Sequence, residues 1–223
     1  MSRFLRLAAV LAALPLLRAA TDTPLLSHLL SSVESRYNNA RTLQVSFQEV
    51  YNGVGGRRQT ESGDLYLRKP GKMRWDYKAP AGKLFLSDGK QVFFYNPATN
   101  RAEKTKLKET EDMRAPLAFL LGKLDFSKDF REFQLKNQTA PSPTVAAVPK
   151  SDKLPYKQVE FTVNPMKGYA IEKLVVTSQD NSTLVFAFAN EQVNPALNDK
   201  LFRFDLPKGA QWADLTPGEP ATR

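Results

Sequence analysis

The sequence predicts a mainly β protein of the α+β class, with a strongly curved antiparallel sheet of about ten or eleven strands and about three short helical segments. Two patterns lead to this prediction. Short runs of alternating apolar and polar residues, separated by turn residues, fill most of the chain after residue 40, and a period of two is typical of strands with one buried face. Segments 24–40 and 111–123 have helical apolar spacing instead, so helices can cover one open side of the sheet.

The clearest strands lie between residues 63 and 97. Turn residues separate them at Pro70-Gly71, at 80–82 and at Asp88-Gly89, and the last pair favours a tight hairpin. The run 92–95 (VFFY) is apolar at every position, so alternation leaves open which of its two faces points inward. The side chains that we expect on the apolar face of this region are Leu65, Leu67, Met73, Trp75, Tyr77, Leu84 and Leu86.

A helix and a strand precede this region. Residues 24–40 have apolar side chains at i, i+3/i+4 and i+7/i+8, with Thr23 as the expected N-cap and Pro24 as the first helical residue. The stretch 52–59 (NGVGGRRQ) is expected to form a mobile, glycine-rich turn after a strand at 41–51. The apolar side of that strand consists of Leu43, Val45 and Phe47.

The second half of the chain begins with helical signals and continues with strands. Pro116 can open a short helix that ends at Gly122, and 125–133 can add one or two helical turns. The proline-rich stretches around 139–155 indicate, taken alone, a linker and a domain boundary. Strands are expected at 133–137, 145–150, 157–163, 171–178, 182–188 and 200–207.

Residues 1–20 predict a secretory signal. Two arginines precede the apolar run 7–17, which is too short to span a bilayer, and Ala19-Ala20 supply small residues for cleavage. Arg18 leaves the cut site open, and an uncleaved anchor is the alternative. Residues 21–223 are expected to form one soluble, exported domain, which without cysteine is neither lipidated nor disulfide-bonded.

The formal net charge is +9, and three of the positive charges fall in the predicted signal. No basic block with interleaved aromatic residues has a nucleic-acid-binding spacing, so we expect no nucleic-acid partner. Attraction to anionic membrane surfaces or acidic partners fits this charge, as does a scattering of solvated charges.

The sequence offers no recognisable catalytic or metal-binding motif. His28 is the one histidine, and a surface or lid position in the N-terminal helix accounts for it. The chain lacks the Cys and His ligands of the usual zinc sites, and its GVGG run lacks the Lys-Ser/Thr of a phosphate loop. We therefore expect no enzyme and no cofactor or metal; a cell-envelope hydrolase that depends on His28 is the enzymatic alternative.

The order and spacing of motifs between 63 and 97 resemble the periplasmic outer-membrane lipoprotein carrier family, the LolA-type chaperones. The matching pieces are Gly63-Asp64-Leu65, Lys69-Pro70, Trp75, Pro80 and the run LFLSDGKQVFFYNP. Weaker similarity continues through 159–165, 171–183 and 200–212. The resemblance implies that 145–150 is a strand of the same continuous sheet and not part of a linker.

This resemblance implies an incomplete β-barrel with a helical lid and a space between them that takes up acyl chains. It implies a monomeric carrier, without a cofactor, that accepts acylated lipoproteins from an inner-membrane lipoprotein-releasing ABC transporter complex and hands them to an outer-membrane acceptor. A regulatory or sensory protein of the same fold, which binds mislocalised lipoproteins or lipid, is the alternative. Such relatives often carry a second domain, for which this chain is too short.

The acyl chains are expected to lie between the sheet and the lid. The cavity residues are expected to be Leu43, Val45, Phe47, Leu65, Leu67, Trp75, Tyr77, Leu84 and Leu86. The lid is expected to present Leu26, Leu30, Val33, Leu117, Phe119, Leu120 and Leu121.

Two residues have expected roles beyond apolar contact. Lys69 shares the parity of Leu65 and Leu67, so it should point inward, where carbonyls at a helix end are natural acceptors for an ammonium group. The family commonly has an arginine at this position, and the resemblance implies that it acts as a latch to the lid. A lysine would make a looser latch. The alternative is that Lys69 reaches the rim and has no special role. Met73 matches a hydrophobic position that resembles a docking point for the membrane complex, so a place at the rim is expected.

Overall fold

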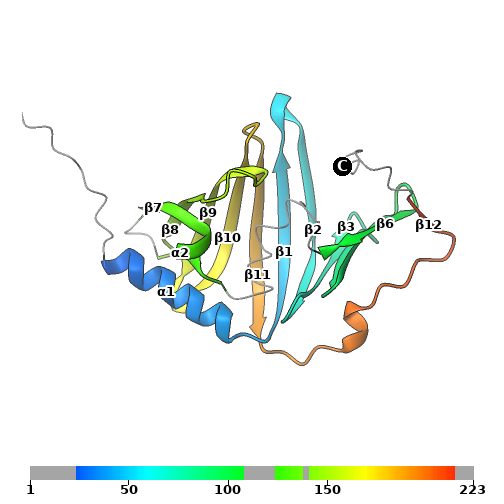
Figure 1. Cartoon of the computed structure of the whole chain (residues 1–223), viewed down its shortest axis with the longest axis horizontal. Helices are drawn as coiled ribbons and strands as arrows, with labels where there is room; N and C mark the ends of the chain where they lie inside the picture. The colour runs from blue at the N-terminus through cyan, green and yellow to red at the C-terminus, as the bar shows by residue number, and fades with distance from the viewer. Residues whose placement is uncertain (1–23, 108–123, 138–140, 214–223) are drawn as a thin grey trace, which may run out of the picture.

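The computed structural model describes residues 24–107, 124–137 and 141–213. They form one twelve-stranded sheet in the order β12-β6-β5-β4-β3-β2-β1-β11-β10-β9-β8-β7. Figure 1 shows this sheet as an open, curved fan whose edge strands, β7 and β12, do not meet. The strands are β1 (Thr42–Asn52), β2 (Arg58–Arg68), β3 (Lys72–Ala79), β4 (Leu84–Asp88), β5 (Gln91–Asn96), β6 (Arg101–Lys106), β7 (Phe130–Lys136), β8 (Thr144–Pro149), β9 (Tyr156–Asn164), β10 (Ala170–Ser178), β11 (Thr183–Val193) and β12 (Gln211–Trp212).

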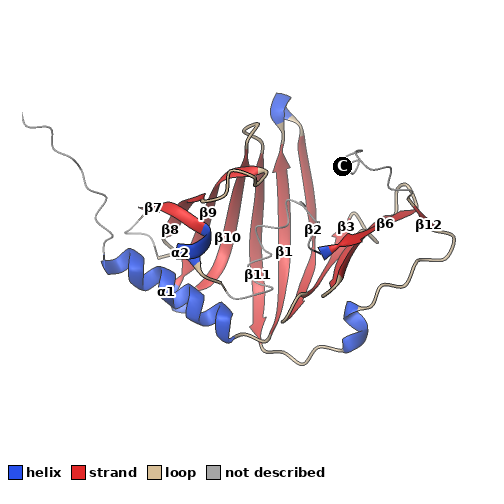
Figure 2. Ribbon diagram, in the orientation of Figure 1, coloured by secondary structure: helices blue, strands red, loops and turns tan. Residues whose placement is uncertain are grey.

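Helices are few in the described part of the chain (Figure 2). The long one, α1 (Pro24–Asn39), matches the helix that the apolar spacing predicts. The helix expected at 125–133 is confined to α2 (Phe126–Asp129), because the next residues join β7 and pair with β8. The predicted signal and the predicted helix at 111–123 lie outside the described residues. Short 3-10 turns are η1 (Val54–Gly56), η4 (Pro165–Lys167) and η5 (Asp199–Phe202).

The structure corrects the predicted sheet in two ways. It adds β6, whose sequence RAEKTK has no apolar alternation, and β12, a two-residue strand that pairs with β6 in parallel, whereas all other pairs are antiparallel. The strand predicted at 200–207 is wrong. That stretch forms η5 and then irregular backbone, because its aromatic side chains pack on the sheet instead of its backbone pairing with a strand.

The inner face of the sheet is the face against which α1 packs. Val45, Leu65, Trp75, Phe85 and Phe94 are directly paired across five neighbouring strands, β1 to β5, and paired residues of antiparallel strands point to the same face. The first four of these and the buried side chains of α1 belong to one hydrophobic cluster, and Phe94 packs against it. The core therefore lies between the sheet and α1.

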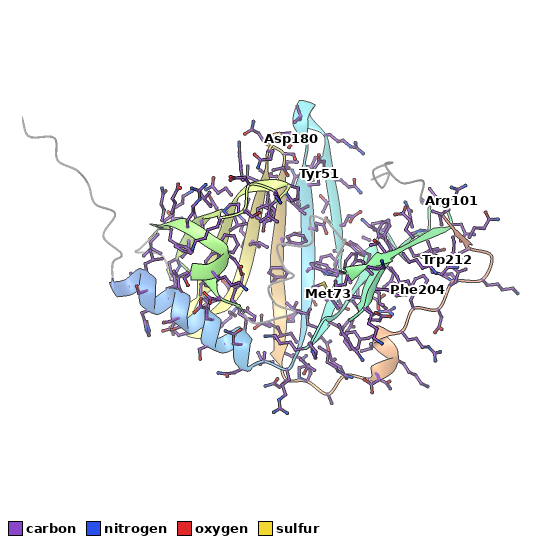
Figure 3. The ribbon with its side chains drawn as sticks, in the orientation of Figure 1. Tyr51, Met73, Arg101, Asp180, Phe204 and Trp212 are labelled. Atoms are coloured by element: carbon purple, nitrogen blue, oxygen red, sulfur yellow. The ribbon has the colours of Figure 1, made fainter. Side chains whose placement is uncertain are left out.

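The opposite, outer face of β3 to β6 is covered by the 195–213 segment. Phe204 of this segment stacks on Phe93 with ring centroids 4.8 Å apart, and Trp212 lies 5.7 Å from Phe204 beside β6 (Figure 3). Arg74 Nη1 donates to the Leu201 carbonyl over 3.2 Å. Leu86 of β4 is consequently buried on the outer face, and Phe93 of β5 is partly buried there.

Candidate functional site

An aromatic cluster forms the centre of the inner face. The ring of Phe47 lies 4.7 Å from that of Trp75 and 5.2 Å from that of Tyr77, and Trp75 lies 5.4 Å from Phe186. The strands place these rings together because Phe47 and Phe186 extend from β1 and β11, next to β2 and β3 in the sheet order. The result is a broad apolar surface with α1 packed on it.

Seven of the nine residues predicted for the cavity lie in this inner cluster: Leu43, Val45, Phe47, Leu65, Leu67, Trp75 and Tyr77. Their burial shows that they share the sheet's apolar side. That they contact acyl chains stays a prediction.

The prediction that Leu84 and Leu86 line the cavity is wrong, because both residues lie on the outer face. Leu86 is paired with Arg74 and Phe93, and Leu84 with Asp76 and Tyr95, none of which shares the face of Trp75. The inner residue of β4 is Phe85, which sequence reasoning missed. The same register settles the orientation of the 92–95 run: Val92 and Phe94 point inward, and Phe93 and Tyr95 point outward.

Met73 is not at a rim. Its side chain is 2% exposed, and its sulfur accepts a hydrogen bond from Trp75 Nε1 over 2.9 Å. With α1 packed on the sheet this thioether is buried, so the expected place of Met73 at the rim is corrected. That Met73 is a docking residue stays a prediction. Figure 3 shows its position within the sheet, away from the edge strands.

The described half of the predicted lid is α1. Leu26 and Val33 are buried in the inner cluster and Leu30 is partly buried against it, while Leu29 and Tyr37 add buried contacts that the prediction did not include. The other predicted lid residues, Leu117, Phe119, Leu120 and Leu121, lie outside the described residues.

Lys69 joins the β2–β3 turn to the end of α1. Its Nζ donates to the Tyr37 carbonyl over 2.7 Å, and burial lowers the pKa of the Lys69 ammonium. The carbonyl belongs to the last turn of α1, where helix carbonyls lack intrahelical partners. Arg68 faces the other way, donating to the Leu197 carbonyl and pairing with Asp199 on the outer face.

On its other side, α1 is bound to β10 and β11. Tyr37 Oη donates to Glu191 Oε2 over 2.8 Å, and Arg36 Nε donates to Glu191 Oε1 over 3.0 Å. The Tyr37 hydroxyl also accepts from the Ile171 backbone N–H over 2.9 Å. Burial, reinforced by the charge of Glu191, raises the pKa of Tyr37.

Further along α1, His28 is exposed, and its Nε2 lies 3.0 Å from Tyr169 Oη, just before β10. Asn38 exchanges two hydrogen bonds with the backbone of Leu124, over 2.8 and 2.7 Å. Within the described residues, α1 therefore has several polar contacts to β10, β11 and the 124–126 stretch. From the half of the sheet that contains β2 to β6, α1 receives one hydrogen bond in the described part of the chain, the one that Lys69 donates.

A set of paired charges lies on the inner face, where the β1–β2 hairpin extends away from α1. Glu61 is 4% exposed, and Lys83 Nζ lies 2.5 Å from its Oε2. Tyr77 Oη donates to Glu49 Oε2 over 3.3 Å, and Lys83 Nζ lies 4.5 Å above the Tyr77 ring. Sequence reasoning missed these groups, although Glu49 and Glu61 share the parity of the apolar residues in their strands. They bound the apolar surface with polar side chains.

No helix in the described ranges is both long and apolar enough to cross a membrane.

Comparison with known proteins agrees with this architecture. Residues 38–205 match the family model described as outer membrane lipoprotein carrier protein LolA. The outer-membrane lipoprotein carrier protein of Sodalis glossinidius is 28% identical over 183 residues, covering 82% of this chain and 86% of that protein. That of Klebsiella pneumoniae is 29% identical over 180 residues, covering 80% and 84%.

A solved structure shows the fold. The crystal structure of an uncharacterized conserved protein from Thermus thermophilus matches with a TM-score of 0.51 at 12% identity, covering 84% of this chain and 97% of that one. Because the family model spans most of the sequence, including β1 to β11, the assignment is firm. This chain belongs to the LolA family of outer membrane lipoprotein carrier proteins.

Proposed function

We propose that this chain is a periplasmic carrier of acylated lipoproteins. It accepts them from the inner-membrane lipoprotein-releasing ABC transporter complex and delivers them to an acceptor at the outer membrane. The observation that carries the proposal is the family match over residues 38–205. The exported form, residues 21–223, acts as a single monomeric domain, and transfer involves no cofactor and no covalent step.

The inner face supplies the chemistry that such cargo needs. Burying one methylene group of an acyl chain is worth ~0.8 kcal/mol, so a sixteen-carbon chain gains on the order of 12 kcal/mol. The inner face is apolar across five neighbouring strands, from Val45 to Phe94. The acyl chains would lie against this surface, under the helical lid.

Cargo and α1 compete for the same surface. Val33 and Tyr37 of α1 are almost completely buried against the inner cluster, so acyl chains reach it only when the lid moves away. The free energy of opening is subtracted from the free energy of binding, which keeps the net affinity low enough for release.

Lys69 acts in this scheme as the latch. Its hydrogen bond to the Tyr37 carbonyl stabilises the closed state, and it is the described polar link between α1 and the β2–β6 half of the sheet. Because α1 has more polar contacts to β10 and β11, the lid opens on the Lys69 side. Removal of the latch favours the open state and retains cargo longer.

The test is a release assay. Spheroplasts that hold a labelled triacylated lipoprotein are incubated with purified residues 21–223, and the supernatant is analysed by gel filtration for a soluble one-to-one complex. The expected result is a complex that passes its lipoprotein to outer-membrane vesicles. A protein that releases nothing, yet binds free acylated peptide, would contradict the carrier role and support lipid sensing. An inner-face variant, Phe47→Asp, serves as the control for non-specific extraction.

A further inference from the structure

The β1–β2 hairpin ends in an uncovered, positively charged tip. The hairpin tip, residues 53–58, contains three glycines, one valine and two arginines. Val54 is 70% exposed, although valine is usually a core residue. Gly55 and Gly56 have φ values of +78° and +81°, and a Cβ added to either would meet no atom within 4 Å. Nothing in the described part of the protein covers this tip.

The tip projects beyond the neighbouring strands. β3 pairs with β2 from Ser62 to Arg68, so the stretch 58–61 of β2 has β1 as its one strand partner in the described sheet. Figure 1 shows the β1–β2 hairpin as the part of the sheet that extends farthest in that direction. The ring of Tyr51 lies against Gly53 at the start of the tip, since a Cβ added to Gly53 would lie 2.9 Å from Tyr51 Cε1. The tip can therefore touch a flat surface before the rest of this end does.

The charge of the tip is not neutralised by its surroundings. Arg57 and Arg58 are exposed and make no ion pair with any described residue, whereas Arg36, Arg68 and Arg74 are each held by a carboxylate. The carboxylates at this end are already engaged: Glu61 pairs with Lys83, and Asp180 accepts hydrogen bonds from Ser182. Two guanidinium groups thus remain available to an external anion.

We propose that the hairpin tip docks on an anionic lipid surface. Planar guanidinium groups bind phosphate oxygens in a two-pronged geometry, and each basic residue near an anionic membrane adds a modest electrostatic attraction. Val54 inserts its apolar side chain into the headgroup layer of the membrane. The neighbouring glycines have no side chains, so the backbone of the tip can approach the headgroups closely. One valine and two arginines give a weak, reversible contact. Such a contact suits a protein that must leave the membrane again, and it does not depend on the proposed cargo.

The first test is flotation of residues 21–223 with vesicles of 30% phosphatidylglycerol and 70% phosphatidylcholine, at low and at physiological salt. The double variant Arg57→Gln/Arg58→Gln is expected to lower the partition coefficient about 25-fold, at about fivefold per arginine. The matched control Lys90→Gln/Lys200→Gln removes the same net charge from two exposed positions at the opposite end of the sheet and is expected to change binding less than twofold. Equal losses in both variants would overturn the proposal, because overall charge would then explain the binding.

The second test locates the contact. The chain has no cysteine, so Val54→Cys and Lys90→Cys each give one site for an environment-sensitive fluorophore. Added anionic vesicles should shift the emission at position 54 to the blue and leave position 90, at the opposite end of the sheet, unchanged. A wild-type protein that does not bind these vesicles, or a label at 54 that stays in water while the protein is bound, would overturn the lipid proposal. An acidic protein surface would then be the partner to seek.

Discussion

Lys69 and Tyr37 connect the two halves of the sheet through the end of α1: Lys69 Nζ donates to the Tyr37 carbonyl over 2.7 Å, and the Tyr37 hydroxyl donates to Glu191 on β11 over 2.8 Å. One residue of the helix thus accepts a hydrogen bond from the β2–β3 turn and makes another to β11. The two links differ in strength. On the β11 side, Glu191 also accepts a hydrogen bond from Arg36, and the Tyr37 hydroxyl accepts another from the Ile171 N–H. On the other side, the described structure has the single hydrogen bond from Lys69.

The weaker link is the natural place for the lid to open, which leads to the first prediction. Lys69→Leu is expected to retain an acylated peptide longer and to pass it on about fivefold more slowly. A hydrogen bond from a charged donor is worth roughly 1.5–3 kcal/mol, and partial exposure of Lys69 reduces this to about 1 kcal/mol. The measurement is the rate at which a fluorescent lipopeptide moves from the loaded protein to acceptor vesicles.

Lys69→Arg is the matched control for this latch. A guanidinium keeps the charge and can donate to the Tyr37 carbonyl, so the transfer rate should remain within about twofold of wild type, and any change should be an increase, because a tighter latch favours the closed state that releases cargo. Unchanged transfer in Lys69→Leu would remove the latch role from Lys69.

Glu191 carries the second prediction. Glu191→Gln is expected to lower the free energy of unfolding by about 1–3 kcal/mol, because Arg36 loses its carboxylate and the Tyr37 hydroxyl loses a charged acceptor in a buried setting. Urea unfolding followed by tryptophan fluorescence measures the change. The control is Asp205→Asn, which breaks an exposed pair with Arg203 and should cost less than about 0.5 kcal/mol. Equal effects of the two substitutions would show that the Glu191 network contributes no more than an exposed pair.

The sequence predicts the inner face well where the outer face is in water. In the parts of β1, β2 and β3 nearest α1, polar residues such as Ser46 and Asp64 alternate with the buried ones, and alternation assigns the apolar side chains correctly. Leu84 and Leu86 fail because the outer face of β4 is itself covered, by Phe204 and its neighbours. A strand that is buried on both faces has no alternation to detect.

The 195–213 segment could not be predicted for a related reason. Its residues 200–207 alternate like a strand, yet their aromatic side chains pack across β5 while Arg74 binds the Leu201 carbonyl. Whether such a run pairs or packs depends on partners about a hundred residues away in the sequence, so local pattern cannot decide it. The burial of Met73 depends on distant contacts in the same way, since α1 and the sheet enclose it together.

The register of β5 makes a third prediction that compares adjacent phenylalanines. A benzophenone amino acid at position 94 should crosslink to the acyl chain of a bound lipopeptide, because Phe94 points inward with Phe85. At position 93 the same group should crosslink within the protein to the 195–213 segment, where Phe93 stacks on Phe204. Mass spectrometry of the irradiated complex identifies both products. Acyl crosslinks from position 93 and none from position 94 would place the lipid on the outer face.

Tyr156 gives the last prediction, a loss of stability at high pH. Tyr156 is 6% exposed at the start of β9, and burial, aided by the negative charge of Asp129, raises its pKa to about 12. An unfolded tyrosine loses its proton near pH 10, so between pH 10 and about 12 the folded state binds more protons than the unfolded state. Stability contributed by the neutral phenol is therefore complete below pH 10 and falls as pH rises, by at most ~1.4 kcal/mol per pH unit.

Urea unfolding of wild type and Tyr156→Phe from pH 8 to about pH 12 tests this. Above pH 10 the free energy of unfolding should fall less steeply with pH in the phenylalanine variant, by the contribution of about one proton. The contribution of Tyr37, whose pKa is also raised by burial, persists in both proteins. Asp129→Asn removes the negative charge near the phenol, so it should start the decline at the same pH and end it sooner. Parallel curves for wild type and Tyr156→Phe would mean that the phenol titrates alike in the folded and unfolded states. The phenol would then be in contact with water, and the packing of β9 against the inner cluster would have to be looser at this end than the buried position of Tyr156 implies.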